Sequence, residues 1–282
     1  MSRPLDLNGR VVVVTGGARG IGLATVERLA RAGARVAAGD LDADLVVRTA
    51  GEVADRTGAV VLAGGLDVAD PGSWEEFLAT VAPLGPVDVL VNNAGIMPLG
   101  SVLEEPTDVA RAIVDVNLHG VINGTKAVAP GMVDRGLGHI VNVASAVGRV
   151  AVAHGATYSA SKFAVVGFTE ATRAELAPAG VHVSMVLPTV VRTELAAGVP
   201  AARGVNPVSA EDVAEVIVET IQRPRAESWV PRWSKGVSRA ADLMPQRAKE
   251  ALAHLMKADS VLAEADDDAR AAYEARVRRP GS

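Results

Sequence analysis

Residues 10–22 read Arg-Val-Val-Val-Val-Thr-Gly-Gly-Ala-Arg-Gly-Ile-Gly, an apolar run that leads directly into a glycine-rich turn. An amphipathic segment follows at Ile21–Ala32, with Leu23, Val26 and Leu29 at helical spacing. Strand, glycine turn and helix in this order are typical of a site for a dinucleotide pyrophosphate, because glycine lets the backbone approach the phosphates at a helix N-terminus. The spacing G-x-x-x-G-x-G is one residue longer than the common fingerprint, and a tight turn without a ligand is the alternative.

Apolar segments of strand length alternate with helix-length segments along most of the chain. We expect strands at Arg10–Thr15, Arg35–Gly39, Val60–Leu66, Val87–Val91, His139–Ala144, Val181–Leu187 and Ser228–Val230. Most are nearly continuous runs of Val, Ile and Leu, which indicates burial on both faces. We therefore predict an α/β fold, a Rossmann-type doubly wound parallel sheet of about seven strands with helices on both faces.

The pattern changes near Arg232, and we divide the chain into a domain at 1–231 and an α-helical C-terminal extension at 232–282. The extension contains no strand pattern. Its apolar stripe at helical spacing consists of Val237, Ala241, Met244, Ala248, Leu252 and Leu255. We expect these helices to pack on the domain or on a neighbouring subunit. A membrane-surface helix, with Trp229 and Trp233 as anchors, is the weaker alternative because its polar face mixes acids with bases.

The composition excludes several classes of protein. The 282 residues are 49% hydrophobic and 22% charged, which is enough apolar material for a core. The absence of cysteine excludes disulfides and thiolate metal sites, and the five histidines lack metal-binding spacing. A net charge of −5 argues against a nucleic-acid-binding protein. We find neither a signal peptide nor a membrane span, so we expect a cytoplasmic protein without membrane contact.

Two charged residues bear on the choice of dinucleotide. Asp40 ends the second predicted strand, where a carboxylate can accept hydrogen bonds from ribose hydroxyls and disfavours a 2′-phosphate. Arg19, inside the glycine turn, is a natural phosphate partner and favours NADP. We give Asp40 more weight, because a phosphate beside a carboxylate is costly, and we expect NAD. A solvated acid or a helix cap is the alternative for Asp40.

The residues with the clearest chemistry are Ser145, at the end of the fifth predicted strand, and the pair Tyr158 and Lys162. Tyr158 and Lys162 are four residues apart and share one face of a predicted helix. A nearby ammonium favours the phenolate, so we expect Lys162 to lower the pKa of Tyr158 and make it a general acid or base. Ser145 can hold a substrate oxygen. A surface ion pair and a capping hydroxyl are the alternatives.

These motifs, together with Asn92-Asn93-Ala94-Gly95 after the fourth predicted strand, resemble the short-chain dehydrogenase/reductase family from about Leu7 to Val230. The resemblance implies that Ser145, Tyr158 and Lys162 are catalytic. It assigns Asn117 to the family's fourth catalytic position, where the asparagine helps to hold a water for a proton relay.

The resemblance also implies a cofactor site. Asp67 and Val68 would be adenine neighbours, and the segment Pro188–Thr193 would face the nicotinamide carboxamide. Thr189 stands where the family has glycine, which puts the local backbone shape in question. The implied cofactor-binding residues are Gly16, Ala18, Arg19, Gly20, Ile21, Gly22, Asp40, Leu41, Asp67, Val68, Asn93, Ala94, Gly95, Tyr158, Lys162, Pro188, Val191 and Thr193.

The expected function is reversible hydride transfer between NAD(H) and a small-molecule secondary alcohol or ketone. The segments Ile96–Leu99, Ala146–His154 and Thr189–Asn206 would line the substrate site, and their composition favours an apolar substrate. An NADPH-dependent ketoreductase of the same fold, acting on 3-oxoacyl thioesters, is one alternative. A non-catalytic NAD-binding sensor or scaffold is the other. The family resemblance also implies a homodimer or homotetramer.

Overall fold

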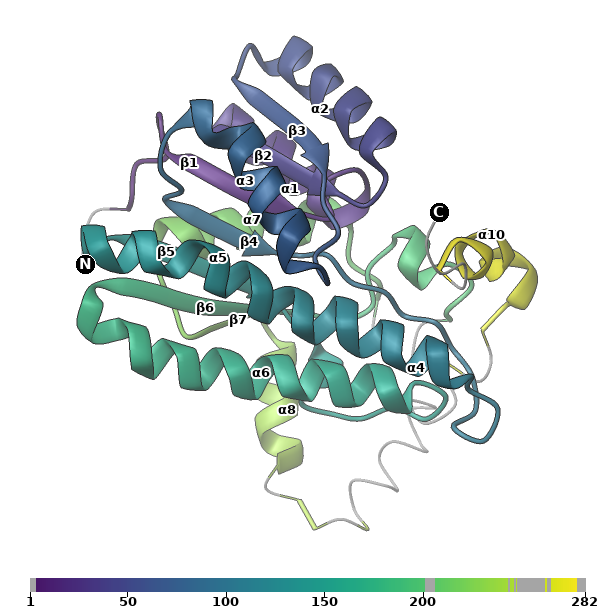
Figure 1. Cartoon of the computed structure of the whole chain (residues 1–282). Coiled ribbons are helices and arrows are strands. Elements are labelled where there is room, and N and C mark those ends of the chain that lie inside the picture. The colour runs from purple at the N-terminus through teal and green to yellow at the C-terminus, as the bar shows by residue number, and fades with distance from the viewer. Residues whose placement is uncertain are drawn as a thin grey trace.

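The computed structural model describes residues 4–200, 206–242, 244, 245, 247, 262 and 265–277. Seven strands form one parallel sheet in the order β3-β2-β1-β4-β5-β6-β7 (Figure 1). They are β1 (Val11–Thr15), β2 (Arg35–Asp40), β3 (Val61–Gly65), β4 (Val89–Asn92), β5 (Gly138–Val143), β6 (Val181–Pro188) and β7 (Glu227–Val230). All seven predicted strands and the α/β class are confirmed, with strand ends shifted by at most two residues.

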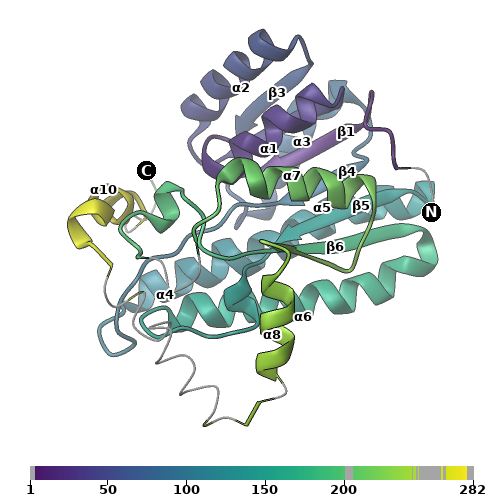
Figure 2. The same cartoon turned by 180° about the vertical axis from the view of Figure 1, so that it is seen from behind.

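Helices cover both faces of the sheet, as predicted. They are α1 (Gly20–Arg31), α2 (Ala43–Thr57), α3 (Pro71–Val81), α4 (Thr107–Val114), α5 (Gly120–Arg135), α6 (Ala156–Leu176), α7 (Ala210–Gln222), α8 (Ser234–Asp242) and α10 (Asp267–Val277). Helices α3, α5 and α6 lie on the face toward the viewer in Figure 1, and α1 and α7 lie on the face seen in Figure 2.

Successive side chains of β1 enter two different apolar layers. Val12 and Val14 are fully buried in the layer that contains residues of α1 and α7. Val11 and Val13 are buried in the opposite layer, which contains residues of α3 and α5. Because alternate residues of a strand point to opposite faces, an unbroken run of valine fills both layers.

The strand order reverses at β1, which pairs with β2 on one side and with β4 on the other. Connections therefore leave the carboxyl ends of β1 and β4 toward opposite sides of the sheet and open a crevice at that edge. The glycine turn after β1 and the Asn-Asn-Ala-Gly segment after β4 meet at this crevice. The fold thus brings together motifs that are far apart in the sequence.

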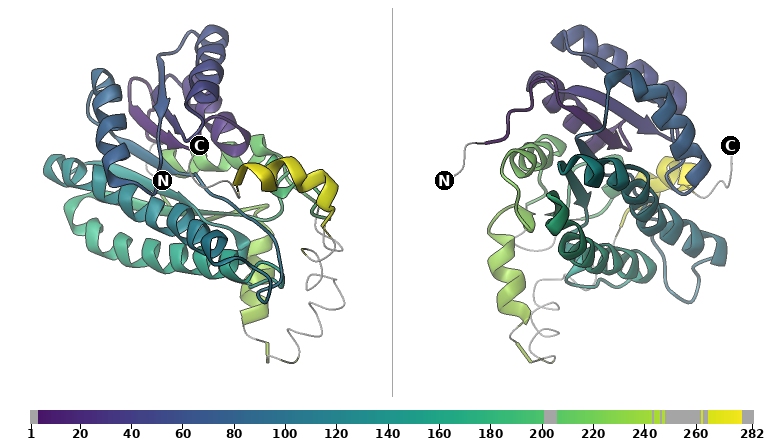
Figure 3. Two further views of the ribbon diagram at one scale, coloured as in Figure 1. Left: turned by 45° about the vertical axis from the view of Figure 1, so that its right-hand side comes forward. Right: turned by 60° about the vertical axis from the view of Figure 1, so that its left-hand side comes forward.

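The expected helical extension is present. Helix α8 follows β7 and projects away from the sheet, whereas α10 returns to the carboxyl edge of the strands (Figures 1 and 3). In the predicted stripe, Val237 and Met244 are exposed. The remaining members lie outside the described residues, except for the backbone of Ala241. No helix in the described ranges is long and apolar enough to cross a membrane.

Helix α5 packs very closely on its neighbours at Gly124. A Cβ atom at this position would lie 2.6 Å from Asn92 Oδ1 and 2.6 Å from Trp74 Cζ2. Trp74 is 1% exposed, and Asn92 Nδ2 donates to Asn142 Oδ1 at 2.9 Å, so neither side chain can move freely. Glycine is therefore required here for packing.

We predict that Gly124→Ala lowers the free energy of unfolding by about 1–3 kcal/mol, the usual cost of overpacking. Gly51→Ala is the matched control, because Gly51 lies within α2 and a Cβ there meets nothing within 4 Å. It should raise stability by about 0.5–1 kcal/mol through helix propensity. Urea unfolding at equal protein concentration measures both, and equal effects would contradict the packing argument.

Candidate active site

The glycine turn after β1 has a shape that only glycine can adopt. Gly16 has a φ of 65°, and a Cβ there would lie 2.9 Å from Ala94 Cα. A Cβ on Gly22 would lie 1.9 Å from the Gly16 carbonyl oxygen. The hydrogen-bond ladder of α1 starts with Leu23 N donating to Arg19 O, so the N–H groups of the preceding residues are directed out of the helix start. This arrangement fits a pyrophosphate.

The Asn-Asn-Ala-Gly segment holds the glycine turn in place. Asn93 Nδ2 donates to the carbonyl oxygens of Thr15 (2.9 Å) and Gly16 (3.2 Å). In return, Thr15 Oγ1 accepts hydrogen bonds from the N–H groups of Asn93 and Ala94, both at 3.0 Å. The Asn93 side chain thus fixes the start of the glycine turn through the carbonyl oxygens of Thr15 and Gly16. Thr15 was not predicted as a site residue, although a hydroxyl at the last position of a buried strand is a sequence signal for such a role.

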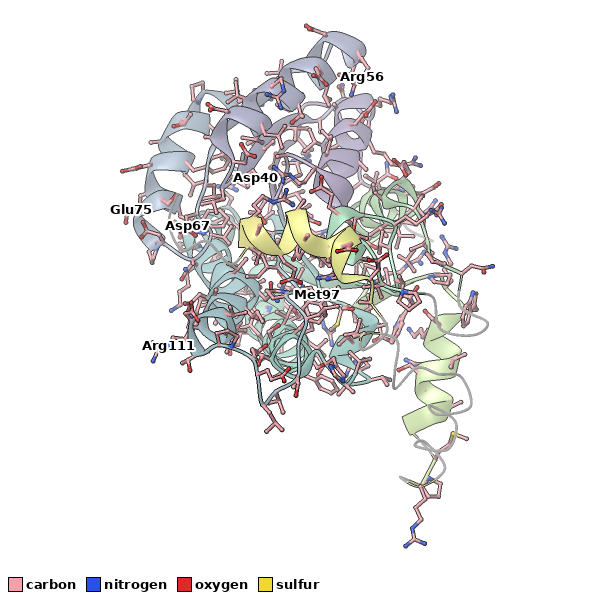
Figure 4. The ribbon with its side chains drawn as sticks, turned by 90° about the vertical axis from the view of Figure 1, so that its right-hand side faces the viewer. Asp40, Arg56, Asp67, Glu75, Met97 and Arg111 are labelled. Carbon is pink, nitrogen blue, oxygen red and sulfur yellow. The ribbon has the colours of Figure 1, made fainter. Side chains whose placement is uncertain are left out.

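Both carboxylate oxygens of Asp40 accept hydrogen bonds from neighbouring backbone N–H groups. Its Oδ2 accepts from Ala18 N at 3.0 Å and its Oδ1 accepts from Asp42 N at 3.1 Å. The alternative of a helix cap does not apply to Asp40, because Asp42 caps α2 by accepting from Leu45 N. Asp40, which is labelled in Figure 4, therefore places a carboxylate at the end of β2 against the backbone of the glycine turn.

Arg19 is held by two acidic residues. Its guanidinium lies 2.6 Å from Asp42 Oδ2 and 3.6 Å from Glu194 Oε2. Leu41, which follows β2, is 71% exposed. Arg19 is thus already paired within the protein.

The remaining predicted cofactor residues lie along the same edge. Asp67 is exposed and its Oδ1 accepts from Ala69 N, while Val68 is buried. Thr193 Cγ2 is 3.3 Å from the position of a Cβ on Gly20, which places the loop after β6 against the glycine turn. Thr189 N donates to Val230 O at 2.9 Å, so the threonine continues the pairing of β6 with β7.

Two further predicted cofactor residues, Pro188 and Val191, lie where β6 ends and its loop begins. Pro188 is the last residue of β6 and is paired in register with Val230. Val191 is 7% exposed and forms an isolated parallel bridge with Val208. Both therefore belong to the base of the loop that ends at Thr193.

Ser145, Tyr158 and Lys162 are brought together and buried. Ser145 follows β5, and its Oγ accepts from Val147 N at 3.1 Å. Tyr158 and Lys162 lie on α6, with Lys162 Nζ 5.8 Å from the centre of the Tyr158 ring and 3.2 Å from Val143 O. The end of β5 thus lies against the face of α6 that carries the tyrosine and the lysine.

Burial controls the ionisation of this group. It raises the pKa of Tyr158 from 10.0 to about 12, against a smaller opposite effect of the Ser145 side chain. It also lowers the pKa of Lys162 from 10.5 to about 8. The predicted lowering of the Tyr158 pKa by Lys162 is therefore wrong for this structure. Removing the phenolate from water raises the pKa of Tyr158, and the group that opposes this effect is Ser145. The Lys162 ammonium donates to the Val143 carbonyl.

Asn117 lies in a π-helical turn, Asp115–His119, between α4 and α5. Its Oδ1 accepts from Ile96 N at 2.8 Å, and its Nδ2 donates to Ile96 O at 3.0 Å and Ser161 Oγ at 3.1 Å. A Cβ on Gly95 would lie 3.2 Å from Asn117 Oδ1 and 3.6 Å from Lys162 Nζ. Asn117 therefore lies next to the lysine and fixes the loop after β4. Widened helical turns of this kind are frequent at functional sites.

An apolar cluster surrounds Tyr158, as expected. Tyr158 is buried together with Met97, Val109 and Ile113. Partly buried members of the cluster are Ile96, Leu99, Val147, Leu195 and Val199. His154 is exposed and does not reach this cluster. In the part of the chain that the structure describes, no three histidine or acidic side chains gather as a metal site.

Two side chains of α10 also reach the cluster. Met97 N donates to Tyr273 Oη at 2.6 Å, and Arg270 Nη2 donates to Met97 O at 2.7 Å. Neither residue was predicted as part of the site. The sequence around them carries no motif, and only the return of α10 to the sheet edge brings them there.

Comparisons with known proteins agree with this geometry. A family model for short chain dehydrogenases matches residues 10–204. A 1-deoxy-11-beta-hydroxypentalenate dehydrogenase of Streptomyces exfoliatus is 39% identical over 228 residues, which cover 78% of this chain and 82% of the relative. A 3-alpha-(or 20-beta)-hydroxysteroid dehydrogenase of Mycobacterium tuberculosis is 38% identical over 195 residues, or 69% of this chain and 74% of the relative.

Solved structures have the same fold. The crystal structure of a short chain dehydrogenase/reductase from Burkholderia phymatum in complex with NAD superimposes with a TM-score of 0.76 at 27% identity. The alignment covers 83% of this chain and 93% of that one. A glycine turn that fits a pyrophosphate, in a fold that holds NAD in this relative, indicates a nicotinamide cofactor. The chain belongs to the short-chain dehydrogenase/reductase family of oxidoreductases.

Proposed function

We propose that this protein transfers hydride reversibly between NAD(H) and an apolar secondary alcohol or ketone. The observation that carries the proposal is the convergence of Ser145, Tyr158 and Lys162 beside the glycine turn, under an apolar cluster. A phenol, a cation and a hydroxyl in one buried site can exchange the proton of an alcohol and stabilise the charge that develops on its oxygen.

Tyr158 is the proposed acid and base. In the oxidation direction its oxygen takes the proton of the substrate hydroxyl while the C–H bond gives up a hydride; in the reduction direction it returns the proton. The nicotinamide cofactor, when bound, supplies the acceptor or donor of that hydride. Ser145 is proposed to donate a hydrogen bond to the substrate oxygen and to stabilise the charge that develops on it.

Lys162 is proposed to bind the nicotinamide ribose hydroxyls and to link to the water held at Asn117. Its burial lowers its pKa to about 8, so the side chain is mainly protonated at neutral pH. Asn117 lies next to Lys162 and is proposed to hold a water that relays the proton, with its side chain fixed by Ile96.

NAD is proposed over NADP because of the charges below the glycine turn. A 2′-phosphate there would meet the Asp40 carboxylate, while Arg19 is already paired with Asp42 and Glu194. We extend the adenosine end of the proposed cofactor site from Asp40 to Leu41, Asp67 and Val68.

The substrate class follows from the surroundings of Tyr158. The cluster around it is apolar on the sides formed by α4, the loop after β4 and the loop after β6. The two dehydrogenase relatives are named for hydroxyl-bearing compounds, one of them a steroid. We propose a neutral apolar alcohol or ketone of this general kind.

We also propose that residues 1–231 form the catalytic domain, that 232–282 form an extension, and that the protein is a homodimer or homotetramer. Helices α5 and α6 are the proposed contact surface. Val133 on α5 and Phe163 on α6 are 39% and 43% exposed, which leaves apolar surface for a second copy.

Tyr158→Phe should lower turnover at least about 100-fold, because the phenol oxygen that exchanges the proton is lost while the ring still packs. NADH binding, measured by fluorescence, should change little. Turnover of a panel of secondary alcohols and ketones gives the result. Retention of wild-type turnover would exclude Tyr158 as the acid and base.

Lys162→Met should abolish turnover and yet stabilise the protein at pH 7. Removing the burial cost of the ammonium contributes about 3 kcal/mol, and losing the hydrogen bond to Val143 O subtracts about 1 kcal/mol. Lys162 loses its proton near pH 8 when folded and near 10.5 when unfolded. The unfolded wild-type chain therefore binds more protons in this interval, and wild-type stability rises with pH there.

The stability advantage of Lys162→Met should accordingly shrink between pH 8 and 10.5. Chemical unfolding at several pH values measures it. Lys126→Met, at an exposed position on α5, is the control and should show no such pH dependence. A constant difference between wild type and Lys162→Met would contradict the buried ammonium.

Asp42→Asn should shift the ratio of NADPH to NADH affinity toward NADPH by about two- to fivefold, since it releases Arg19 from an exposed ion pair. Asparagine keeps the side-chain oxygen that accepts from Leu45 N and caps α2. Asp44→Asn removes the same charge one residue into α2 and is the control. Equal shifts in both variants would show a general charge effect instead.

The wild type distinguishes the alternatives in the same assays. A clear preference for NADPH would favour a 3-oxoacyl reductase and overturn the assignment of Asp40. Tight NADH binding without turnover of any alcohol or ketone would favour a sensor or scaffold.

A further inference from the structure

Helix α10 lies across the carboxyl edge of the sheet. In Figure 4 it crosses the face of the domain between Asp40 and Asp67 on one side and Met97 on the other. The chain is anchored just before the helix, where Asp266 N donates to Gly198 O at 2.9 Å. The helix therefore lies above the same edge that carries Tyr158.

Arg270 fastens this helix to two loops at once. The residue is 1% exposed, and its guanidinium donates to Met97 O at 2.7 Å and to Leu195 O and Ala197 O at 3.1 Å each. Met97 belongs to the loop after β4, and Leu195 and Ala197 belong to the loop after β6. Both loops contribute to the apolar cluster around Tyr158. One buried side chain thus ties together two walls of the proposed substrate site.

The charge of Arg270 is balanced locally. Glu274, one turn later on α10, lies 3.0 Å from its Nη2. A buried guanidinium with a carboxylate and three carbonyl oxygens around it is satisfied. The helix therefore presents a neutral underside, which favours an uncharged substrate over a carboxylate or a phosphate.

Tyr273 is a second buried side chain of α10. It is 7% exposed, its Oη accepts from Met97 N, and Arg270 lies 5.1 Å from its ring centre. Its phenol is near enough to Tyr158 for their charges to interact. Burial raises the pKa of Tyr273, so it stays a neutral phenol and does not compete with Tyr158 as a base.

We propose that α10 is the roof of the substrate site and that Tyr273 is a specificity-determining residue, which limits the size of the alcohol or ketone that reaches Tyr158. The inference rests on the proposed function. The hydroxyl of Tyr273 accepts from the Met97 amide, and the guanidinium groups of Arg270 and Arg276 lie over its ring, 5.1 and 5.8 Å from the centre. A large, rigid ring with these contacts sets a boundary that a flexible side chain would not.

The test compares kcat/KM for secondary alcohols of increasing size, from 2-butanol to a hydroxysteroid, in the full-length protein. Tyr273→Ala should raise the ratio of bulky to small substrate at least about tenfold, because pocket size discriminates by roughly 10–200-fold. Cofactor affinity should be unchanged. Tyr273→Phe keeps the ring but loses its hydroxyl contact, and it should change the size profile less than Tyr273→Ala does. Ala272→Gln, exposed on the same helix, is the control.

Hydrogen exchange of the Met97 amide provides a second measurement that needs no substrate. Tyr273→Phe removes the acceptor of that amide and should speed its exchange by up to about tenfold. Ala272→Gln should leave the exchange rate unchanged. This measurement reports the docking of α10 even if the enzyme is inactive.

The outcomes separate the two proposals. An active enzyme whose size profile is unaltered in Tyr273→Ala overturns the roof and leaves the proposed function intact. Unaltered exchange at Met97 in Tyr273→Phe also overturns the roof, whatever the activity. If neither the wild type nor any variant turns over an alcohol or ketone, the proposed function fails. The proposal that Tyr273 limits the size of the substrate then fails with it.

Discussion

The Thr15 hydroxyl accepts hydrogen bonds from the amides of Asn93 and Ala94 and so joins the carboxyl ends of β1 and β4. These are the two strands between which the strand order of the parallel sheet reverses. Asn93 completes the joint by donating to the carbonyls of Thr15 and Gly16. This small network sets the shape of the glycine turn. The network also fixes the start of the loop after β4, which contacts Asn117 and the residues around Tyr158. The same hydrogen bonds therefore position both the glycine turn and the surroundings of Tyr158.

The site is built at a cost in stability. Tyr158 and Lys162 are both buried, and burial moves the pKa of each toward its neutral form. A chain selected for stability alone would not place an ammonium there. Asn117 departs from regular structure in its backbone, because it lies in a widened helical turn. Its buried side-chain amide donates to Ile96 O and Ser161 Oγ. The proposed function accounts for both departures.

The last described helix, α10, makes buried contacts with the loops around Tyr158. This helix of the C-terminal extension buries an arginine and a tyrosine against loops that follow β4 and β6. On the outer side, Arg276 pairs with Glu194, which also lies near Arg19 of the glycine turn. Exposed pairs of this kind contribute little, so the buried contacts of Arg270 and Tyr273 hold the helix. The glycine turn, the loops after β4 and β6 and helix α10 therefore form one connected structure.

The seven strands, the parallel sheet, the glycine turn and the residues Ser145, Tyr158 and Lys162 could be predicted from the sequence, because each rests on a short stretch with a local period or spacing. The raised pKa of Tyr158 follows only from the packed molecule, because it depends on burial and is opposite to the direction expected from the nearby lysine. The same holds for the pairing of Arg19 with Asp42 and Glu194, and for the places of Arg270 and Tyr273. Such contacts join residues far apart in the chain, and no local pattern specifies them.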